Sequence, residues 1–354
     1  MTTIATVADR LSGLLDGEVE SGTRRRAEYS TDASNYRVVP QIVAFPRSSE
    51  DIVAAQSFAR EEGMPLTVRG GGTSVAGNSI GTGLVLDLSR HLDRVISIDP
   101  EARTARVQPG TILTTLQKEA ALHGLRFGPD PSTSNRATIG GMIGNNACGP
   151  HAVAWGKTSD NIVSLDVVDG LGRQYTAEKG MKVAGLSELI DANLALIRTH
   201  SGRFSRQVSG YSLEHLLPER GRDLAKLLVG SEGTLATVLE AEVSLVPIAS
   251  GATLLVLGYE DMIRAADAVP RILPLRPLAV EGLDRRLVDI VERARGGVPA
   301  LPDGGGWLMV EVGAFQGESD DIVADRIQAV LAASGTDSYR IAPQGPEAQA
   351  LWKS

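Results

Sequence analysis

The sequence has one cysteine, few aromatic residues and no long apolar run, and each shortage excludes a class of protein. Because Cys148 is the only cysteine among 354 residues, we expect no internal disulfide and no cysteine-ligated cluster within this chain. No stretch approaches the ~18 consecutive apolar residues of a membrane span. The N-terminus lacks the basic start and apolar core of a signal peptide. A net charge of -8 disfavours nonspecific nucleic-acid binding. Since the one cysteine has no partner within the chain, a cytoplasmic protein is the simplest expectation.

Glycine, in contrast, is abundant, with 39 residues against 4% aromatics. A glycine-rich α/β protein whose backbone approaches a ligand has such a composition, and so does a loop-rich protein without a ligand. The length is sufficient for two domains of ~100–200 residues. Composition alone does not separate these alternatives, so the order of segments along the chain has to decide.

Residues 37–247 mix short strands and a few helices at irregular spacing, which predicts an α+β arrangement rather than a doubly wound sheet. Ser48, with Asp51 three residues later, resembles a capping box for a helix that ends at Gly63. Residues 235–246 indicate a pair of strands broken near Glu240. The other predicted strands are 41–45, 66–68, 83–88, 95–98, 104–107, 162–168 and 173–176, and a second helix carries Ile112, Leu116 and Ala120.

A second unit is predicted after Pro247, where strands and helices alternate in an open sheet with helices on one side. We therefore divide the chain into a lead-in (1–36), a first domain (37–247) and a partial second domain (248–354). A further helix begins just before the chain ends at Ser354. Because a domain rarely ends where a new element starts, we expect a truncation there. The expected strands are 252–258, 307–312 and 338–342, and the expected helices are 261–273, 284–295 and 320–333.

Two glycine-rich segments, 69–77 and 137–149, carry most of the chemical information. A run of glycines lets backbone N–H groups converge without obstruction by Cβ atoms, as phosphate binding requires. Two such segments beside strand-like runs predict a diphosphate held from two sides, and hence a dinucleotide. The alternative for the first segment is a tight turn between strands. No lysine follows at the spacing of a Walker A loop.

Further segments at 128–134, 156–162, 209–213 and 230–235 are unspecific alone, but together the set is distinctive. The ordered set resembles the FAD-binding domain of the vanillyl-alcohol oxidase / p-cresol methylhydroxylase superfamily. Within it, the chain is most similar to glycolate oxidase FAD subunits and D-lactate / D-2-hydroxyglutarate dehydrogenases. The motifs are R-G-G-G-T-S-x-x-G (69–77), P-D-P-S (129–132), A-T-I-G-G-M-I-G-N-N-A-C-G (137–149), G-K-T-S-D-N-I (156–162), S-G-Y-S-L (209–213) and G-S-E-G-T-L (230–235).

This resemblance implies a two-subdomain FAD-binding fold of the p-cresol methylhydroxylase type, followed by an incomplete α/β substrate (cap) domain. It implies non-covalent FAD, because Thr73 and Ser74 occupy the region where some members carry a flavin-linking histidine. Cys148 is interpreted as a small packing residue. The implied cofactor-binding residues are Arg69, Gly70, Gly71, Gly72, Thr73, Ser74, Gly77, Asn78, Pro131, Ser132, Thr138, Gly140, Gly141, Gly144, Asn145, Asp160, Ile162, Val163, Glu232 and Gly233. A Gly71→Asp substitution is expected to abolish FAD binding while largely preserving the fold.

The implied reaction is oxidation of a D-2-hydroxy acid, of the lactate, glycolate or 2-hydroxyglutarate type, to the 2-oxo acid by hydride transfer to flavin N5. Weak candidates to assist are Arg206, Tyr211 and His151, each with a structural alternative of packing or hydrogen bonding. No cluster has metal-ligand spacing, so no metal is predicted.

Two other functions stay open. One is a non-catalytic or truncated FAD-binding or electron-transfer module, and the other is an NADPH-dependent flavin reductase on the same fold. The sequence of residues 140–151 also resembles that of large flavoproteins with a C-terminal iron–sulfur region. An iron–sulfur domain or subunit is therefore one candidate electron acceptor, and whether this chain is active alone stays open.

Overall fold

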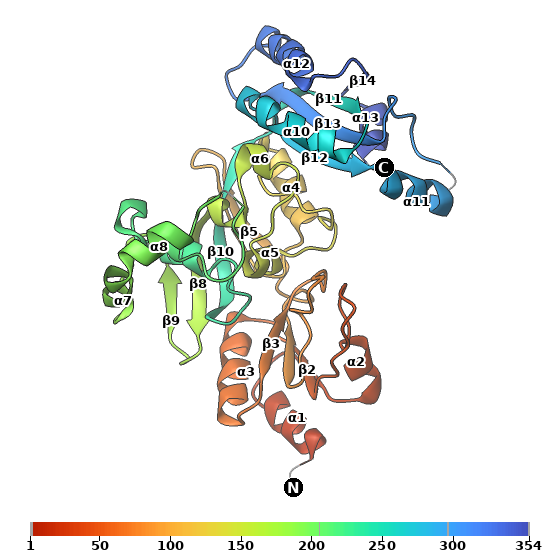
Figure 1. Ribbon diagram of the computed structural model, residues 1–354. Helices are drawn as coiled ribbons and strands as arrows, with labels where there is room; N and C mark the ends of the chain where they lie inside the picture. Colours follow the sequence, from red (N-terminus) through yellow and green to blue (C-terminus); the bar gives the residue numbers. More distant parts are fainter. Residues whose placement is uncertain (1–2, 205, 296, 353–354) are drawn as a thin grey trace. The chain divides into compact units, whose positions relative to one another are not determined.

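The chain folds into two units, which the computed structural model describes for residues 3–204, 206–295 and 297–352 (Figure 1). The first unit comprises Met1–Gly149 and Gly156–Val246, and the second comprises Pro150–Trp155 and Pro247–Ser354. Residues 150–155 thus leave the first unit in the middle of its sequence and belong to the second. Among the described residues, no helix is both long enough and apolar enough to cross a bilayer.

The first sheet of the first unit has the strand order β1-β2-β4-β3, in which β2, β4 and β3 run parallel and β1 is antiparallel to β2. All four residues of β4 are buried, as is typical of a strand between two parallel neighbours. The strands are β1 (Glu18–Glu20), β2 (Ile42–Phe45), β3 (Leu66–Arg69) and β4 (Leu84–Asp87), and the helices are α1 (Ile4–Ser12), α2 (Thr23–Glu28) and α3 (Ser49–Glu61).

Helix α3 begins as its sequence indicates, with one difference. The Ser48 hydroxyl accepts a hydrogen bond from the Asp51 N–H at 3.2 Å, which caps the helix. The Asp51 carboxylate does not return to Ser48, as a full capping box would require. It accepts hydrogen bonds from the N–H groups of Arg47 and Asp16 instead. Asp51 therefore fastens α3 to the segment that follows α1.

The second sheet has the order β5-β6-β10-β8-β9, with β7 paired to β10. Residues 236–247 form one continuous strand, β10, rather than the predicted pair. The register shifts between Val238 and Glu240, so a bulge takes up the irregularity without ending the strand. The strands are β5 (Val95–Asp99), β6 (Thr104–Val107), β7 (Leu125–Phe127), β8 (Ile162–Asp169), β9 (Gln174–Ala177) and β10 (Ala236–Pro247).

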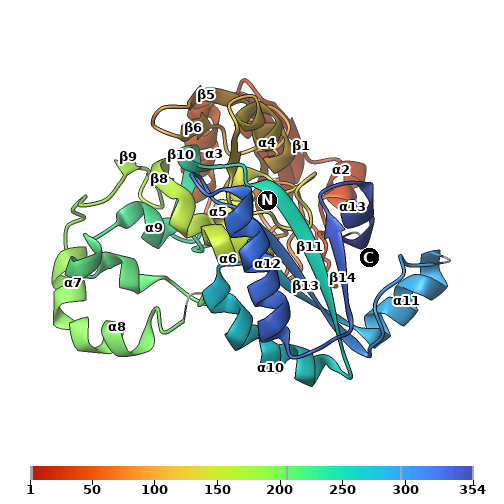
Figure 2. The same ribbon diagram turned by 90° about the horizontal axis from the view of Figure 1, so that it is seen from above.

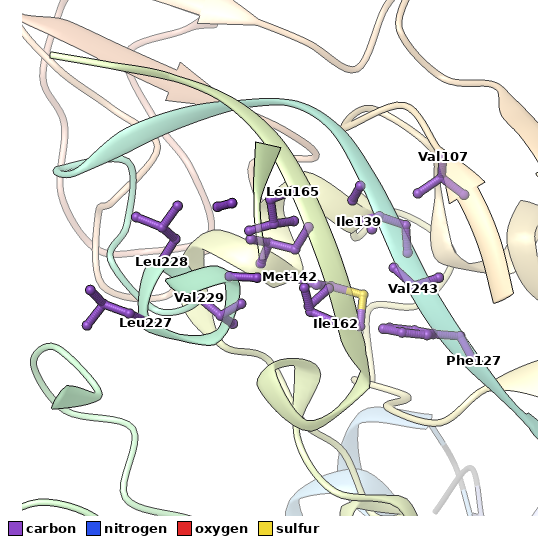
Figure 3. Packing of buried hydrophobic residues seen from close by; sticks show 14 of the residues in the cluster. Val107, Phe127, Ile139, Met142, Ile162, Leu165, Leu227, Leu228, Val229 and Val243 are labelled. Carbon is purple, nitrogen blue, oxygen red and sulfur yellow. The ribbon is translucent and has the colours of Figure 1, made fainter. Parts of the chain in front are cut away.

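Helix α5 (Ile139–Asn145) occupies the second glycine-rich segment, where the sequence pattern indicated a loop. The Thr138 hydroxyl caps it by accepting the Gly141 N–H at 3.1 Å. Ile139, Met142 and Ile143 are buried, and Figure 3 shows Ile139 and Met142 packed among residues of β8, β10 and the 227–229 segment. Burial of each such side chain stabilises the fold by about 1.5–3 kcal/mol, which outweighs the poor helix propensity of the three glycines.

Helices α7 and α8 lie together at one edge of the first unit (Figures 1 and 2). They come between β9 and the segment that carries Arg206 and Tyr211, two of the candidate catalytic residues. The remaining helices of this unit are α4 (Leu113–Ala121), α7 (Leu186–Ala192), α8 (Leu194–His200) and α9 (Leu224–Leu228), with short 3-10 turns η1 (Thr158–Asn161), η2 (Leu213–Leu216) and η3 (Pro218–Arg220).

The second unit is an antiparallel sheet of order β12-β13-β11-β14 with helices on both faces, which corrects the expectation of one covered face. Alternate strand residues such as Leu255 and Leu257 pack on α10 and α12, which lie side by side in Figure 2. Leu254 and Val256 face the opposite way, toward the cluster of α11 and α13. Strand β12 was not predicted. The elements are β11 (Ser250–Tyr259), α10 (Met262–Ile272), η4 (Leu273–Leu275), β12 (Ala279–Asp284), α11 (Arg285–Arg295), β13 (Gly306–Ala314), α12 (Asp320–Ser334), β14 (Tyr339–Pro343) and α13 (Pro346–Trp352). Helix α6 (Ala152–Trp155), in the 150–155 segment, also belongs to this unit.

His215 is a buried titratable group in the first unit, at 6% exposure in η2. Its Nε2 atom has no hydrogen-bond partner among the described residues. Burial lowers the pKa of His215 below 6.5, and the nearby cations Lys226 and Arg220 act in the same direction, against the carboxylates of Glu214 and Asp160. The folded protein therefore favours the neutral imidazole.

We predict that acidification destabilises the protein through His215. The unfolded chain binds a proton near pH 6.5 while the folded chain resists it, so stability is lost as the pH falls below 6.5, by up to about 1.4 kcal/mol per pH unit. Urea unfolding at pH 7.5 and 5.5 measures the loss, and His215→Gln, which does not titrate, is the control. An equal loss in both proteins would show that His215 does not contribute.

Candidate functional site

A large cleft in the first unit lies between the two glycine-rich segments. It encloses about 1210 Å³ of empty space, part of it open to solvent. The loop after β3 lines one side, and α5 with residues 231–238 lines the other.

Most of the residues predicted to bind a cofactor line this cleft. They come from segments up to about 160 positions apart in the sequence, and the fold brings them to one place. They are Arg69, Gly70, Gly71, Gly72, Thr73, Ser74, Asn78, Pro131, Thr138, Gly140, Gly141, Gly144, Asn145, Glu232 and Gly233.

The other predicted residues lie outside the lining. Gly77 has a φ of +84° and approaches the Tyr36 ring. The Asp160 carboxylate accepts a hydrogen bond from the Lys157 N–H at 2.9 Å. Ile162 is buried in β8. The complete set that does not line the cleft is Gly77, Ser132, Asp160, Ile162 and Val163.

Some of the glycines are needed for contact between the two segments. A Cβ atom on Gly70 would lie 2.1 Å from Thr138 Oγ1, and one on Gly71 would lie 2.1 Å from the Arg136 carbonyl oxygen. Neither distance is compatible with an atom at that place. The expectation that Gly71→Asp preserves the fold therefore conflicts with the geometry, because the new side chain would displace backbone before it reached any phosphate.

The first loop lines the cleft, and its backbone amides have no hydrogen-bond partner among the described residues. None of the described residues accepts a hydrogen bond from the backbone N–H groups of residues 70–74. The first N–H groups of α5 differ, since Ile139 donates to the Thr111 carbonyl and Gly140 to the Pro109 carbonyl. A run of consecutive N–H groups without a protein acceptor, on a loop that lines a cleft, is an arrangement that can bind an anion.

Arg69 and Glu232 are the charged side chains among the described residues that line the cleft. The Arg69 guanidinium donates to the carbonyls of Thr31 at 2.9 Å and Ser79 at 3.2 Å, and lies 5.0 Å from the Tyr29 ring centre. Both of these hydrogen bonds come from Nη1. Burial, and then the charge of Asp87, raise the pKa of Tyr29, whose hydroxyl donates to Asp87 at 2.6 Å.

Helix α5 presents a glycine face to the cleft because its apolar residues are held in the core. A Cβ on Gly144 would find only Glu232 Cα, at 3.9 Å. A Cβ on Gly141 would meet only the capping hydroxyl of Thr138, at 3.1 Å. These two glycines, unlike Gly70 and Gly71, keep open space for a ligand.

Residues 230–234 close the other wall by docking on the end of α5. Gly230 N–H donates to the Ile143 carbonyl at 2.8 Å, and Glu232 N–H donates to the Gly144 carbonyl at 2.9 Å. Glu232 has a φ of +54°, in the left-handed region. Its carboxylate accepts a hydrogen bond from Asn78 Nδ2 of the first loop.

The candidate catalytic residues are placed in different surroundings. Arg206 donates from Nη2 to Cys148 Sγ at 2.8 Å, just beyond α5. The Tyr211 hydroxyl lies 2.8 Å from Thr234 Oγ1, beside the 230–234 segment. His151 belongs to the second unit, where its Nε2 atom lies 2.5 Å from Glu311 Oε2 and its ring stacks on Trp155.

Sequence reasoning missed the apolar part of the lining. Pro109 follows β6 in a Pro-Gly turn, and this pair was the one local signal available for it. Val167 and Val238 look like ordinary strand residues, so nothing local marked them. The main unpredicted lining residues are Val68, Ser79, Leu88, Pro109, Thr133, Ala137, Met142, Ile143, Ala147, Val167, Leu228, Ser231, Ala236, Thr237 and Val238.

Two protein families match the chain. The family described as FAD binding domain matches residues 40–178. The family described as FAD linked oxidases, C-terminal domain, matches residues 248–354. The first match contains both glycine-rich segments.

Curated relatives agree with these families. D-2-hydroxyglutarate dehydrogenase of Pseudomonas putida is 34% identical over 77% of this chain, which spans 29% of that protein. Glycolate oxidase subunit GlcD of Bacillus subtilis is 32% identical over 92% of this chain, which spans 63% of that protein. Among solved structures, alkyldihydroxyacetonephosphate synthase has a TM-score of 0.71 at 15% identity, covering 98% of this chain and 63% of its own. That last likeness concerns the fold alone.

We predict that Gly71→Ala lowers the free energy of unfolding by about 1–3 kcal/mol, because a methyl group must displace the Arg136 carbonyl. Thermal or urea unfolding of the FAD-free protein measures the change. Gly22→Ala is the matched control, since its Cβ would meet nothing within 4 Å. Equal stability of Gly71→Ala and the parent would contradict the close contact.

We predict the opposite pattern for Gly144→Leu. The side chain would extend into the cleft and weaken FAD binding by more than ~10-fold, while stability is kept because glycine is a poor helix residue. FAD titration followed by flavin fluorescence measures binding. Gly170→Leu, in open space at the β8–β9 turn, is the control. Undiminished affinity in Gly144→Leu would place the ligand elsewhere.

Proposed function

Because the chain belongs to the vanillyl-alcohol oxidase / p-cresol methylhydroxylase superfamily of FAD-linked oxidases, we propose that it holds FAD in this cleft and serves the oxidation of a D-2-hydroxy acid to a 2-oxo acid. It carries the FAD-binding domain of that family. The hydroxy-acid substrate is supported by the similarity to D-2-hydroxyglutarate dehydrogenase and to glycolate oxidase subunit GlcD.

The observation that carries the proposal is the unpaired run of N–H groups at residues 70–74. A diphosphate accepts several hydrogen bonds at once, and the residues that carry these amides line the same cleft. The open space beside Gly141 and Gly144 suits a flat ring system, with apolar contacts from residues such as Met142 and Val238. The residues present therefore fit FAD.

The lining also supports non-covalent binding. Among the described residues of the cleft wall there is no histidine, cysteine or tyrosine to link a flavin. Since Arg69 is the one cationic side chain among the described residues of the cleft wall, neutral hydrogen-bond donors would carry most of the diphosphate binding.

Bound FAD would supply the acceptor for the hydride of the substrate. Tyr211 can act toward the substrate only as a hydrogen-bond acceptor. The Thr234 hydroxyl donates to the Ser231 carbonyl at 2.6 Å, so it must accept the proton of the Tyr211 hydroxyl. The Tyr211 oxygen keeps free lone pairs and would accept a hydrogen bond from a substrate hydroxyl.

Arg206 would bind the substrate carboxylate. One of its N–H groups is directed to Cys148 Sγ, and a guanidinium has five in all. The remaining donors offer a paired geometry that matches a carboxylate. We keep His151 as a structural residue of the second unit, paired with Glu311.

The electron acceptor is a separate part of the proposed function. The relatives named above extend well beyond the matched region, with 29% of the Pseudomonas putida protein covered. We propose that an iron–sulfur domain or subunit accepts electrons from the flavin, in the cytoplasm.

We predict that the purified protein retains FAD and that D-2-hydroxyglutarate or D-lactate bleaches its visible absorbance under anaerobic conditions. The L-enantiomers serve as matched controls, and glycolate tests the smallest substrate. Visible spectra before and after each addition are the measurement.

Other outcomes point to other functions. A yellow protein that no hydroxy acid reduces would be a flavin module without turnover of its own. Bleaching by NADPH would indicate a reductase. A protein that shows no flavin absorbance even after incubation with FAD would contradict the proposal as a whole.

A further inference from the structure

The hydrogen bond between Asn78 and Glu232 joins the two walls of the cleft, and we propose that it is a clamp that controls the release of FAD. The inference rests on the proposed binding of FAD in this cleft. Asn78 belongs to the loop that offers the unpaired amides, and Glu232 belongs to the segment docked on α5. The two residues are 154 positions apart in the sequence and both line the cleft.

The orientation of the Asn78 side chain is determined by Ser74. The Ser74 hydroxyl accepts the N–H groups of Ala76 at 3.3 Å and Asn78 at 3.4 Å. Its own proton goes to Asn78 Oδ1 at 2.8 Å. The Nδ2 group of Asn78 therefore points away from its own loop, toward Glu232. The first loop thus presents a preset donor to the opposite wall.

The backbone of Glu232 indicates that its side chain is needed. Gly230, Glu232 and Gly233 all have positive φ, at +84°, +54° and +74°. Glycine adopts such angles without cost, whereas a residue with a Cβ is strained there. A glutamate in this turn is unfavourable for local folding. Its side chain makes the bond to Asn78, which adds to the backbone bonds that Gly230 and Glu232 donate to α5.

The charge of Glu232 favours a clamp over a direct ligand of the diphosphate. A carboxylate repels the phosphates, and no other described residue of the cleft wall is anionic. By accepting the Asn78 amide, the carboxylate is directed to the opposite wall. A hydrogen bond to a charged acceptor is stronger than a neutral one, so the walls are held together until the bond breaks. Release of FAD would then require its opening.

The rate of FAD release tests the clamp in the full chain. The protein is loaded with FAD and diluted, and the rise of flavin fluorescence gives the rate. We expect release to be ~10-fold faster in Glu232→Ala and in Asn78→Ala. The double variant should release no faster than the faster single variant, because both changes remove one bond. Glu188→Ala, an exposed glutamate on α7, is the control for loss of a negative charge.

A second variant separates the clamp from a purely structural role. Glu232→Gly removes the side chain and relieves the strained φ, so the FAD-free protein should unfold at the same or a higher temperature while FAD release is as fast as in Glu232→Ala. If the effects of the two single variants on the FAD release rate multiply in the double variant, the clamp is overturned. Release of FAD from the variants at the parent rate would also overturn it, and the proposed function would stand in both cases. A parent protein that retains no FAD would overturn the proposed function, and the clamp with it.

Discussion

The contact between two glycine-containing segments is the constraint on which the cleft depends. Gly70 and Gly71 lie so close to residues 136–138 that neither position has room for a Cβ atom. This packing holds the loop after β3 against the approach to α5. The N–H groups of residues 70–74, which line the cleft, have no acceptor in a strand or helix among the described residues. The site for an anion is thus a consequence of packing between segments.

Helix α5 is the second element that shapes the cleft, and it does so by having two unlike faces. Ile139, Met142 and Ile143 are buried in the core of the second sheet. Gly141 and Gly144 are left on the open side. Since the apolar face is anchored, the glycine face cannot move into the cleft, and the ligand space is kept without any large side chain.

The chemistry of the cleft is mainly neutral. Arg69 is the one cationic side chain among the described wall residues, and its Nη1 group donates to the Thr31 and Ser79 carbonyls. Glu232 is the one described carboxylate on the wall, and Asn78 engages it from the opposite side. A site of this kind binds an anion by geometry, through many amides placed in advance. It then depends on the walls remaining together.

The amino-acid sequence by itself determined the family and half of the residues that line the cleft, because glycines, prolines and small polar residues in a fixed order are local signals. It did not reveal helix α5, the continuous strand β10 or strand β12, since burial against distant strands overrode local propensity in each case. Only the tertiary structure decided which glycines serve packing and which leave room for a ligand. That distinction depends on the direction of a missing Cβ atom relative to residues far away in the sequence, such as Gly71 against Arg136 and Gly144 beside Glu232.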